Sequence, residues 1–222
     1  MKHALALTAL VPLLSAGIAQ AGGHAEVAAP DGSARTVAID WNDAGDVRVL
    51  SPGAPGYILE KDGTVYSVSK QGEDWLVVDM VKLNAARKAA GASTMQPLYK
   101  TITAISPLGQ SETVAGITGH RYRVTWEENG KSTTETWVLT DNPAVVKMSH
   151  LFSEAMSAAY DYDGKAAENQ AAFFDALPAD EQGLLRSGAT GQLTAFSSQS
   201  PDPQVFDLPA PPADIDKLMG GN

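Results

Sequence analysis

The dipeptide Asn129-Gly130 constrains the fold most strongly, because it stands between two runs of strand-forming residues. Asn-Gly provides the positive backbone angles of a two-residue turn whose twist matches that of paired strands. Counting outward from the turn predicts three facing pairs: Trp126 with Thr133, Val124 with Glu135, and Tyr122 with Trp137. One face of this hairpin is therefore aromatic and apolar, and we expect it to cover a core or a ligand.

A second turn, Asp62-Gly63, predicts another hairpin in the first half of the chain. Counting outward from this turn pairs Leu59 with Tyr66 and Tyr57 with Val68. Residues that face one another across antiparallel strands point to the same side of the sheet. These four side chains are therefore expected to form the core side of the hairpin.

The rest of the pattern predicts an α+β chain. Strand-like runs separated by turn residues fill about 36–80, and a second series begins near residue 98. Helices are predicted over 80–90, where Asp79 is a suitable N-cap, and over 165–177. Further strands are predicted at 145–148 and 193–196. We expect a strongly curved antiparallel sheet, an open half-barrel, with helices covering its concave face.

The first 21 residues have the pattern of a secretory signal peptide. A basic start at Met1-Lys2-His3 is followed by an apolar run that is too short for a permanent membrane helix. Ala19-Gln20-Ala21 supplies the small-x-small pattern after which a signal peptidase cuts, so cleavage is expected after Ala21. The predicted division is a signal peptide (1–21), a flexible mature N-terminus (22–35), a half-barrel domain (36–200) and a proline-rich C-terminal tail (201–222).

The composition indicates the compartment in which the protein acts and disfavours some classes of partner. The chain has no cysteine, which excludes thiolate metal sites and a lipid-modified cysteine, and favours a bacterial periplasm over a disulfide-rich extracellular setting. Its formal net charge of −10 disfavours binding to nucleic acid or anionic lipid headgroups. No further apolar stretch is long enough to span a membrane. We therefore expect a soluble periplasmic protein.

Several sequence blocks resemble a known family. They are Gly56 to Leu59, Asp62 to Tyr66, Trp75 to Met80, Gly116 to Tyr122 and Glu135 to Val138. Their order over roughly 45–210 is similar to exported bacterial domains close to the periplasmic lipoprotein-carrier fold (LolA/LolB-like and RseB-like). This resemblance implies a half-barrel with an apolar interior that holds acyl chains. Members of the family often carry a cysteine near the position of His120, which this chain lacks.

Six residues are candidates for lining such an interior. Five are aromatic residues on the predicted apolar strand faces, and the sixth is a carboxylate between two tryptophans: Tyr57, Tyr66, Tyr122, Trp126, Trp137 and Glu135. Ordinary core packing explains the aromatic residues equally well. Glu135 is either a polar anchor for a ligand or a structural residue at a wet edge or in an ion pair.

A metal site is a separate hypothesis. If the mature chain starts at Gly22, its amine, two backbone amides and the imidazole of His24 can surround Cu(II) or Ni(II) in a plane. Gly22 and Gly23 carry no side chains that would obstruct this chelate. The alternative is a frayed terminus that happens to contain a histidine.

The sequence contains no catalytic motif of the common hydrolase, metalloprotease or nucleotide-binding classes, and no cofactor is expected. The preferred interpretation is a non-enzymatic periplasmic protein that sequesters a hydrophobic small molecule, a lipid or a lipidated partner. The alternatives are the Cu(II)/Ni(II) binder and a protein–protein adaptor in envelope stress or assembly.

Overall fold

The computed structural model describes residues 22–29, 35–51, 53–91, 101–128, 130–161, 164–188 and 191–220. The predicted signal peptide and Asn129 lie outside the described residues. In the part that is described, no helix is long and apolar enough to cross a membrane.

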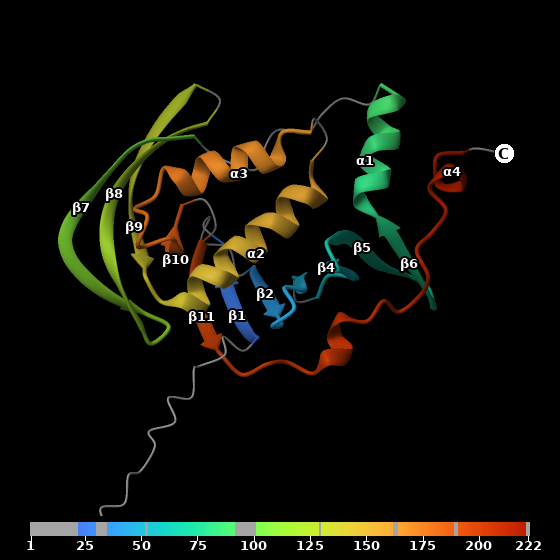
Figure 1. Ribbon diagram of the computed structural model, residues 1–222, viewed down its shortest axis with the longest axis horizontal. Coiled ribbons are helices and arrows are strands. Elements are labelled where there is room, and N and C mark those ends of the chain that lie inside the picture. Colours follow the sequence, from blue (N-terminus) through green and yellow to red (C-terminus); the bar gives the residue numbers. More distant parts are fainter. Residues whose placement is uncertain are drawn as a thin grey trace, which may run out of the picture.

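The described residues form one open antiparallel sheet of eleven strands, with β6 and β7 at its two edges (Figure 1). The strands are β1 (Gly23–Ala28), β2 (Thr36–Trp41), β3 (Val47–Leu50), β4 (Gly56–Lys61), β5 (Thr64–Gln71), β6 (Asp74–Asp79), β7 (Thr101–Val114), β8 (Ile117–Glu128), β9 (Lys131–Thr140), β10 (Gly183–Ser187) and β11 (Gly191–Ser197). The helices are α1 (Met80–Ala89), α2 (Pro143–Ala159), α3 (Ala166–Asp175), the 3-10 helix η1 (Pro203–Phe206) and α4 (Ile215–Leu218). The expected α+β class is confirmed.

The sheet consists of two meanders that meet at one joint. Strands β1 to β6 pair in chain order, and so do β7 to β11. The joint is the antiparallel pair β1–β11, in which His24 lies opposite Ser197 and Ala28 opposite Gln192. The first described strand therefore lies in the middle of the sheet.

Both hairpin registers agree with the sequence prediction. In β8–β9, Tyr122 lies opposite Trp137, Val124 opposite Glu135 and Trp126 opposite Thr133. In β4–β5, Leu59 lies opposite Tyr66 and Tyr57 opposite Val68. Gly63 and Gly130 have φ angles of 72° and 73°, which the two turns require.

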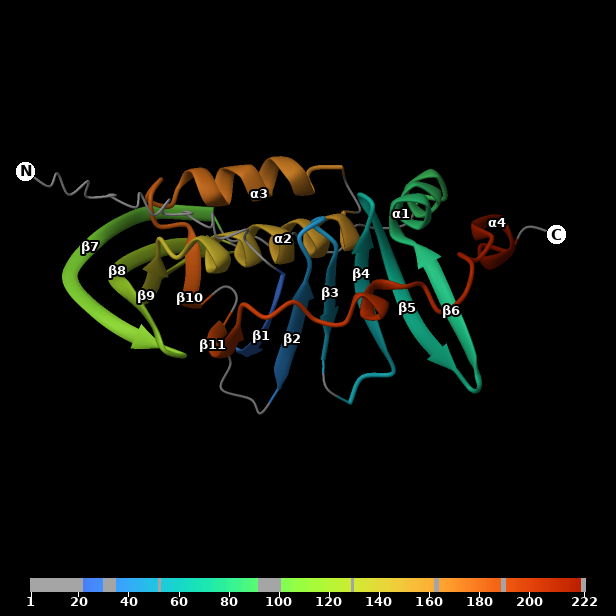
Figure 2. The same ribbon diagram turned by 60° about the horizontal axis from the view of Figure 1, so that its bottom comes forward.

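Helix α2 occupies the segment where a strand was predicted at 145–148. That prediction is wrong because Asn142 caps a helix there: its side-chain Oδ1 accepts hydrogen bonds from the amides of Ala144 and Val145, and Pro143 stands in the first turn. Val145, Met148 and Ala155 of α2 are buried in a cluster with residues of β1, β2 and β3. Figures 1 and 2 show α2 and α3 on the same side of the sheet.

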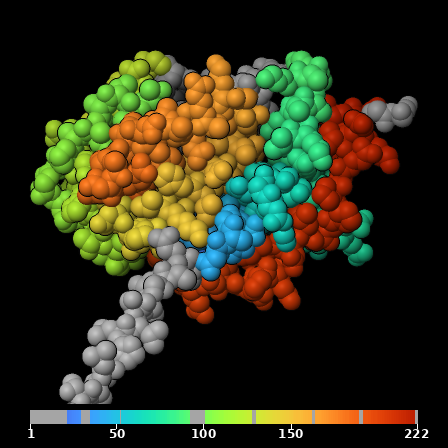
Figure 3. All heavy atoms as spheres, viewed as in Figure 1, coloured from blue at the N-terminus to red at the C-terminus, as the bar shows by residue number. Residues whose placement is uncertain are grey.

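Helix α3 covers the other hairpin. Its Phe173 and Phe174 are buried together with Tyr122, Trp126 and Trp137. In the space-filling view, the atoms of α2 and α3 form a continuous layer beside those of β7 and β8 (Figure 3).

The two terminal segments are more ordered than the sequence indicated. A flexible chain was expected at 22–35, and it contains β1, which pairs with both β2 and β11. An extended or loose tail was expected from residue 201, and it contains η1 and α4, with Phe206 only 2% exposed. Figure 2 shows this C-terminal segment crossing the strands on the side opposite α2.

We predict that Gly23→Ala lowers the free energy of unfolding by about 1–3 kcal/mol, measured by chemical denaturation. The added Cβ would overlap the buried indole of Trp41 and stand 2.6 Å from the carbonyl oxygen of Ser197. Glu26→Ala, on the exposed side of the same strand, is the control and is expected to change stability by less than about 0.5 kcal/mol. Equal stability of Gly23→Ala and the unmodified chain would show that β1 is not anchored in the sheet.

Candidate functional site

A cavity of about 340 Å³ lies where the last turns of α2 pass over strands β2 to β5. Helix α2 contributes Phe152 and Met156, and Tyr160 follows directly after it. The strands and the loop between β3 and β4 supply the rest of the wall: Val37, Val49, Ser51, Ala54, Pro55, Gly56, Tyr57, Ile58, Ser67, Val68 and Ser69. The wall is mainly apolar, with hydroxyl groups of serine and tyrosine residues among its members.

The predicted ligand-binding residues are distributed over three places. Tyr57 contributes to the cavity wall, but alternation along β4 places its side chain on the same face as Leu59. Tyr57 and Tyr66 both pack against a cluster of Leu59, Val68, Val77 and Phe206 on the face of the sheet opposite α2. The aromatic face of the β8–β9 hairpin is core, because Tyr122, Trp126 and Trp137 pack against α3, and the rings of Trp137 and Phe173 are 6.1 Å apart.

Glu135 lines a second, more polar hollow of about 580 Å³ together with Arg186 and Gly188. Its Oε2 accepts a hydrogen bond of 3.3 Å from the indole nitrogen of Trp137, the next residue on the same strand face. A Cβ at position 188 would collide with the Glu135 carboxylate, so a larger residue there would displace this side chain. Glu135 is thus hydrogen-bonded and partly exposed at the end of the aromatic face.

Among the described residues, the largest pKa shift is that of Glu60, which sequence reasoning missed. Glu60 is 9% exposed and shares a strand face with the cavity residue Ile58. Its Oε2 is buried without a hydrogen-bond partner among the described residues. Burial, followed by the nearby carboxylates of Glu154 and Asp46, raises the pKa of Glu60 from 4.5 to about 7.

We predict that Glu60→Gln stabilises the protein by about 1–3 kcal/mol at pH 8 and has little effect near pH 4.5. A carboxyl whose pKa is raised on folding is protonated at no cost in acid, and its ionisation lowers the free energy of unfolding as the pH rises from 4.5 to about 7. Denaturant unfolding at the two pH values measures the difference.

Glu127→Gln, at an exposed site on β8, is the control and is expected to lack this pH dependence. A Glu60→Gln effect that is the same at both pH values would mean that Glu60 does not titrate differently in the folded and unfolded chains.

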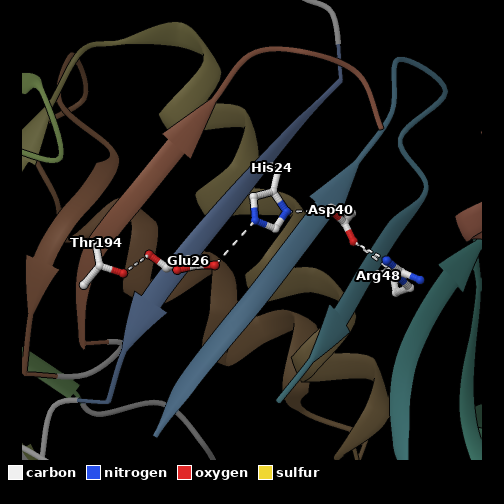
Figure 4. A network of polar contacts seen from close by, with 5 residues as sticks. All are labelled: His24, Glu26, Asp40, Arg48 and Thr194. Carbon is white, nitrogen blue, oxygen red and sulfur yellow. Dashed lines mark hydrogen bonds and ion pairs between the residues drawn. The ribbon is translucent and has the colours of Figure 1, made fainter. Parts of the chain in front are cut away.

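The central strands carry a polar network on the face turned away from α2 (Figure 4). The Asp40 side chain, 6% exposed, accepts two hydrogen bonds at Oδ2 from the Arg48 guanidinium, at 3.1 and 2.7 Å. Its Oδ1 is 2.7 Å from Nδ1 of His24. The network also includes Glu26, whose carboxylate is 4.0 Å from Nε2 of His24, and Thr194, whose hydroxyl donates to the Glu26 carbonyl.

This network determines which ring nitrogen of His24 carries a proton. An ionised carboxylate only accepts hydrogen bonds, so Nδ1 of His24 carries the proton and Nε2 is directed towards Glu26. The planar chelate considered for Gly22, Gly23 and His24 uses backbone amides and the imidazole together. In the structure Gly23 and His24 lie within β1, opposite Trp41 and Asp40, so this chelate requires the start of β1 to leave the sheet. Among the described residues, no group of three or more histidine and acidic side chains is placed to hold a metal ion.

The other two histidines of the described chain hold the loop before β10. Nδ1 of His120 is 2.7 Å from Glu181, and Nε2 of His150 is 3.0 Å from the Gln182 side-chain oxygen. The His150 ring also stacks on Phe174, with centroids 3.9 Å apart. These contacts account for both side chains as structural groups.

We predict that Arg48→Met lowers the free energy of unfolding by about 2–4 kcal/mol, because Asp40 stays buried with His24 as its remaining partner. Arg123→Met, at an exposed position on β8, is the matched control and should leave stability almost unchanged. Chemical denaturation at pH 7 provides the comparison, and similar values for the two variants would show that the Arg48–Asp40 pair is not needed.

Comparisons of the chain with protein-family models, with curated proteins and with solved structures find no match. The cavity and the buried carboxyl groups are therefore the features from which a function can be inferred.

Proposed function

We propose that this chain is a non-enzymatic binding protein that holds one apolar chain, such as the acyl chain of a lipid or of a lipidated partner. In this proposal the sheet is a half-barrel whose concave side is closed by α2 and α3, and the protein acts in the periplasm after export. The observation that carries the proposal is the cavity between α2 and strands β2 to β5.

The cavity has the size and wall chemistry that an apolar ligand needs. Small-molecule sites measure about 300–1,000 Å³ and are lined mainly by apolar side chains with a few polar groups. This cavity, at about 340 Å³, is at the lower end of that range, which suits a single chain better than a whole lipid. Each Å² of apolar ligand surface buried in it contributes about 25 cal/mol before the costs of association.

Serine residues supply the polar groups of the site: Ser51, Ser67 and Ser69. A hydroxyl can donate a hydrogen bond to a carboxyl or ester group at the end of an apolar chain and also accept one.

We predict that the protein binds the apolar fluorophore N-phenyl-1-naphthylamine, that lauric acid displaces it, and that Ser67→Phe weakens binding about tenfold. Ser67 is a half-buried wall residue, so the added ring takes up cavity volume. Fluorescence titration measures the affinity, and thermal unfolding shows that the variant is folded.

Ser132→Phe is the matched control, because it adds the same ring at an exposed position on β9 away from the cavity. If Ser67→Phe binds the fluorophore as tightly as Ser132→Phe, the cavity is not the binding site. Failure of the unmodified protein to bind either apolar probe would overturn the proposed function as a whole.

A further inference from the structure

The face of β3 to β6 turned away from α2 is covered by the chain's own C-terminal segment. We call this face the outer surface; its central residues are Leu59, Val68, Val77, Tyr57 and Tyr66. Phe206 of η1 fills the middle of it, with Val205 and Leu208 packed alongside. The C-terminal segment is seen in red in Figure 2, crossing the strands from β11 towards β6.

Three specific contacts hold residues 203–213 in place. Phe206 is 2% exposed among Leu59, Val68 and Val77. Asp207 forms an ion pair with Lys61 at 3.0 Å. The amide of Ala213 donates a hydrogen bond of 2.7 Å to the carbonyl of Val77 in the edge strand β6. This last contact is the type that an added peptide strand makes with an open sheet edge.

The contacts that fix residues 203–213 are few for the length of chain that they order. Phe206 is the one buried residue of 203–213, and the others are exposed or half-buried. Asp207 is 68% exposed, so its ion pair adds little stability. Each ordered residue costs conformational entropy, which Phe206 and its half-buried neighbours Val205, Leu208 and Ala210 must offset for eleven positions. Such a segment is suited to exchange with a competitor that makes the same contacts.

The outer surface carries lysine side chains beside its aromatic residues. Lys70 lies 6.0 Å from the ring centroid of the 39% exposed Trp75, and Lys61 lies on the same face of β4 as Tyr57. Arg48 lies over the ring of Tyr57, but its charge is already compensated by Asp40 on the same face. This combination favours a peptide that brings an aromatic anchor and carboxylates.

We propose that the outer surface is a peptide-binding site for an extended, acidic segment of a partner protein that carries an aromatic anchor followed by a carboxylate. Residues 203–213 occupy the site in the absence of the partner, with Phe206 and Asp207 in the positions of its anchor and acid. The site lies on the face of the sheet opposite α2 and is independent of the proposed apolar ligand.

The test uses a fluorescein-labelled peptide with the sequence of residues 201–214 and fluorescence anisotropy. The full-length Phe206→Ala protein, whose own anchor is removed, is expected to bind this peptide about tenfold more tightly than the unmodified protein does. A peptide in which the phenylalanine is alanine is expected to bind about tenfold more weakly, and adding Lys61→Glu to the protein is expected to weaken binding of the unmodified peptide.

A second variant, which keeps the buried Phe206, controls for unfolding of the Phe206→Ala protein. Asp207→Lys keeps the buried anchor and replaces the ion pair with Lys61 by repulsion between two lysines, so the protein stays folded and its affinity for the peptide should rise. Equal binding of the two peptides, or no binding by either folded variant, would overturn the proposal. An unmodified chain that sediments as a dimer, and that Phe206→Ala makes monomeric, would also overturn it by showing exchange between two copies.

Discussion

The pairing of β1 with β11 is the interaction on which the rest of the sheet depends. Each meander is built from neighbours in sequence, but neither shares a hydrogen-bonded strand with the other except at this joint. The core under α2 contains residues from both sides of the joint, with Ala25 and Ile39 on one side and Leu185 and Leu193 on the other. Helix α2 therefore packs on a single continuous surface only because β1 completes it.

Two buried carboxyl groups in the first meander, those of Asp40 and Glu60, differ in their hydrogen bonds and in the charges around them. Asp40 receives hydrogen bonds on both oxygens and lies beside a guanidinium, so its charge is compensated. Glu60 lies on the other face, has an oxygen without a hydrogen-bond partner among the described residues, and is close to the carboxylates of Glu154 and Asp46. The first group fixes the structure of the central strands, whereas the second makes the layer under α2 sensitive to pH.

The sequence was sufficient to predict structure that depends on neighbouring residues. Both hairpin registers follow from a two-residue turn and the alternation of side chains, which are features of the local sequence. The expected strand at Val145 failed because a run of apolar residues suits a buried helix face as well as a strand, and the Asn142-Pro143 cap decided between them. The place of β1 depends on pairing with residues far along the chain, which local patterns do not encode.

The candidate site also depends on distant contacts. Alternation predicted apolar strand faces, but α3 and Phe206 rather than a ligand cover most of them. Asp40, between Ile39 and Trp41, was the one local signal of the polar network, since an acid in an apolar strand needs a partner.

The central position of β1 has a consequence for how the chain folds. The hydroxyl of Thr194 bonds to the carbonyl of Glu26 across 168 residues of sequence, so the joint between the meanders cannot form until both parts of the chain are available. Contacts of such long range slow folding, because the entropy of closing the loop is lost before the contacts are gained. Until then β1 and β11 are open edges that can pair with other chains. We therefore expect the pairing of β1 with β11 in the middle of the sheet, rather than the completion of its edges, to limit the rate of folding.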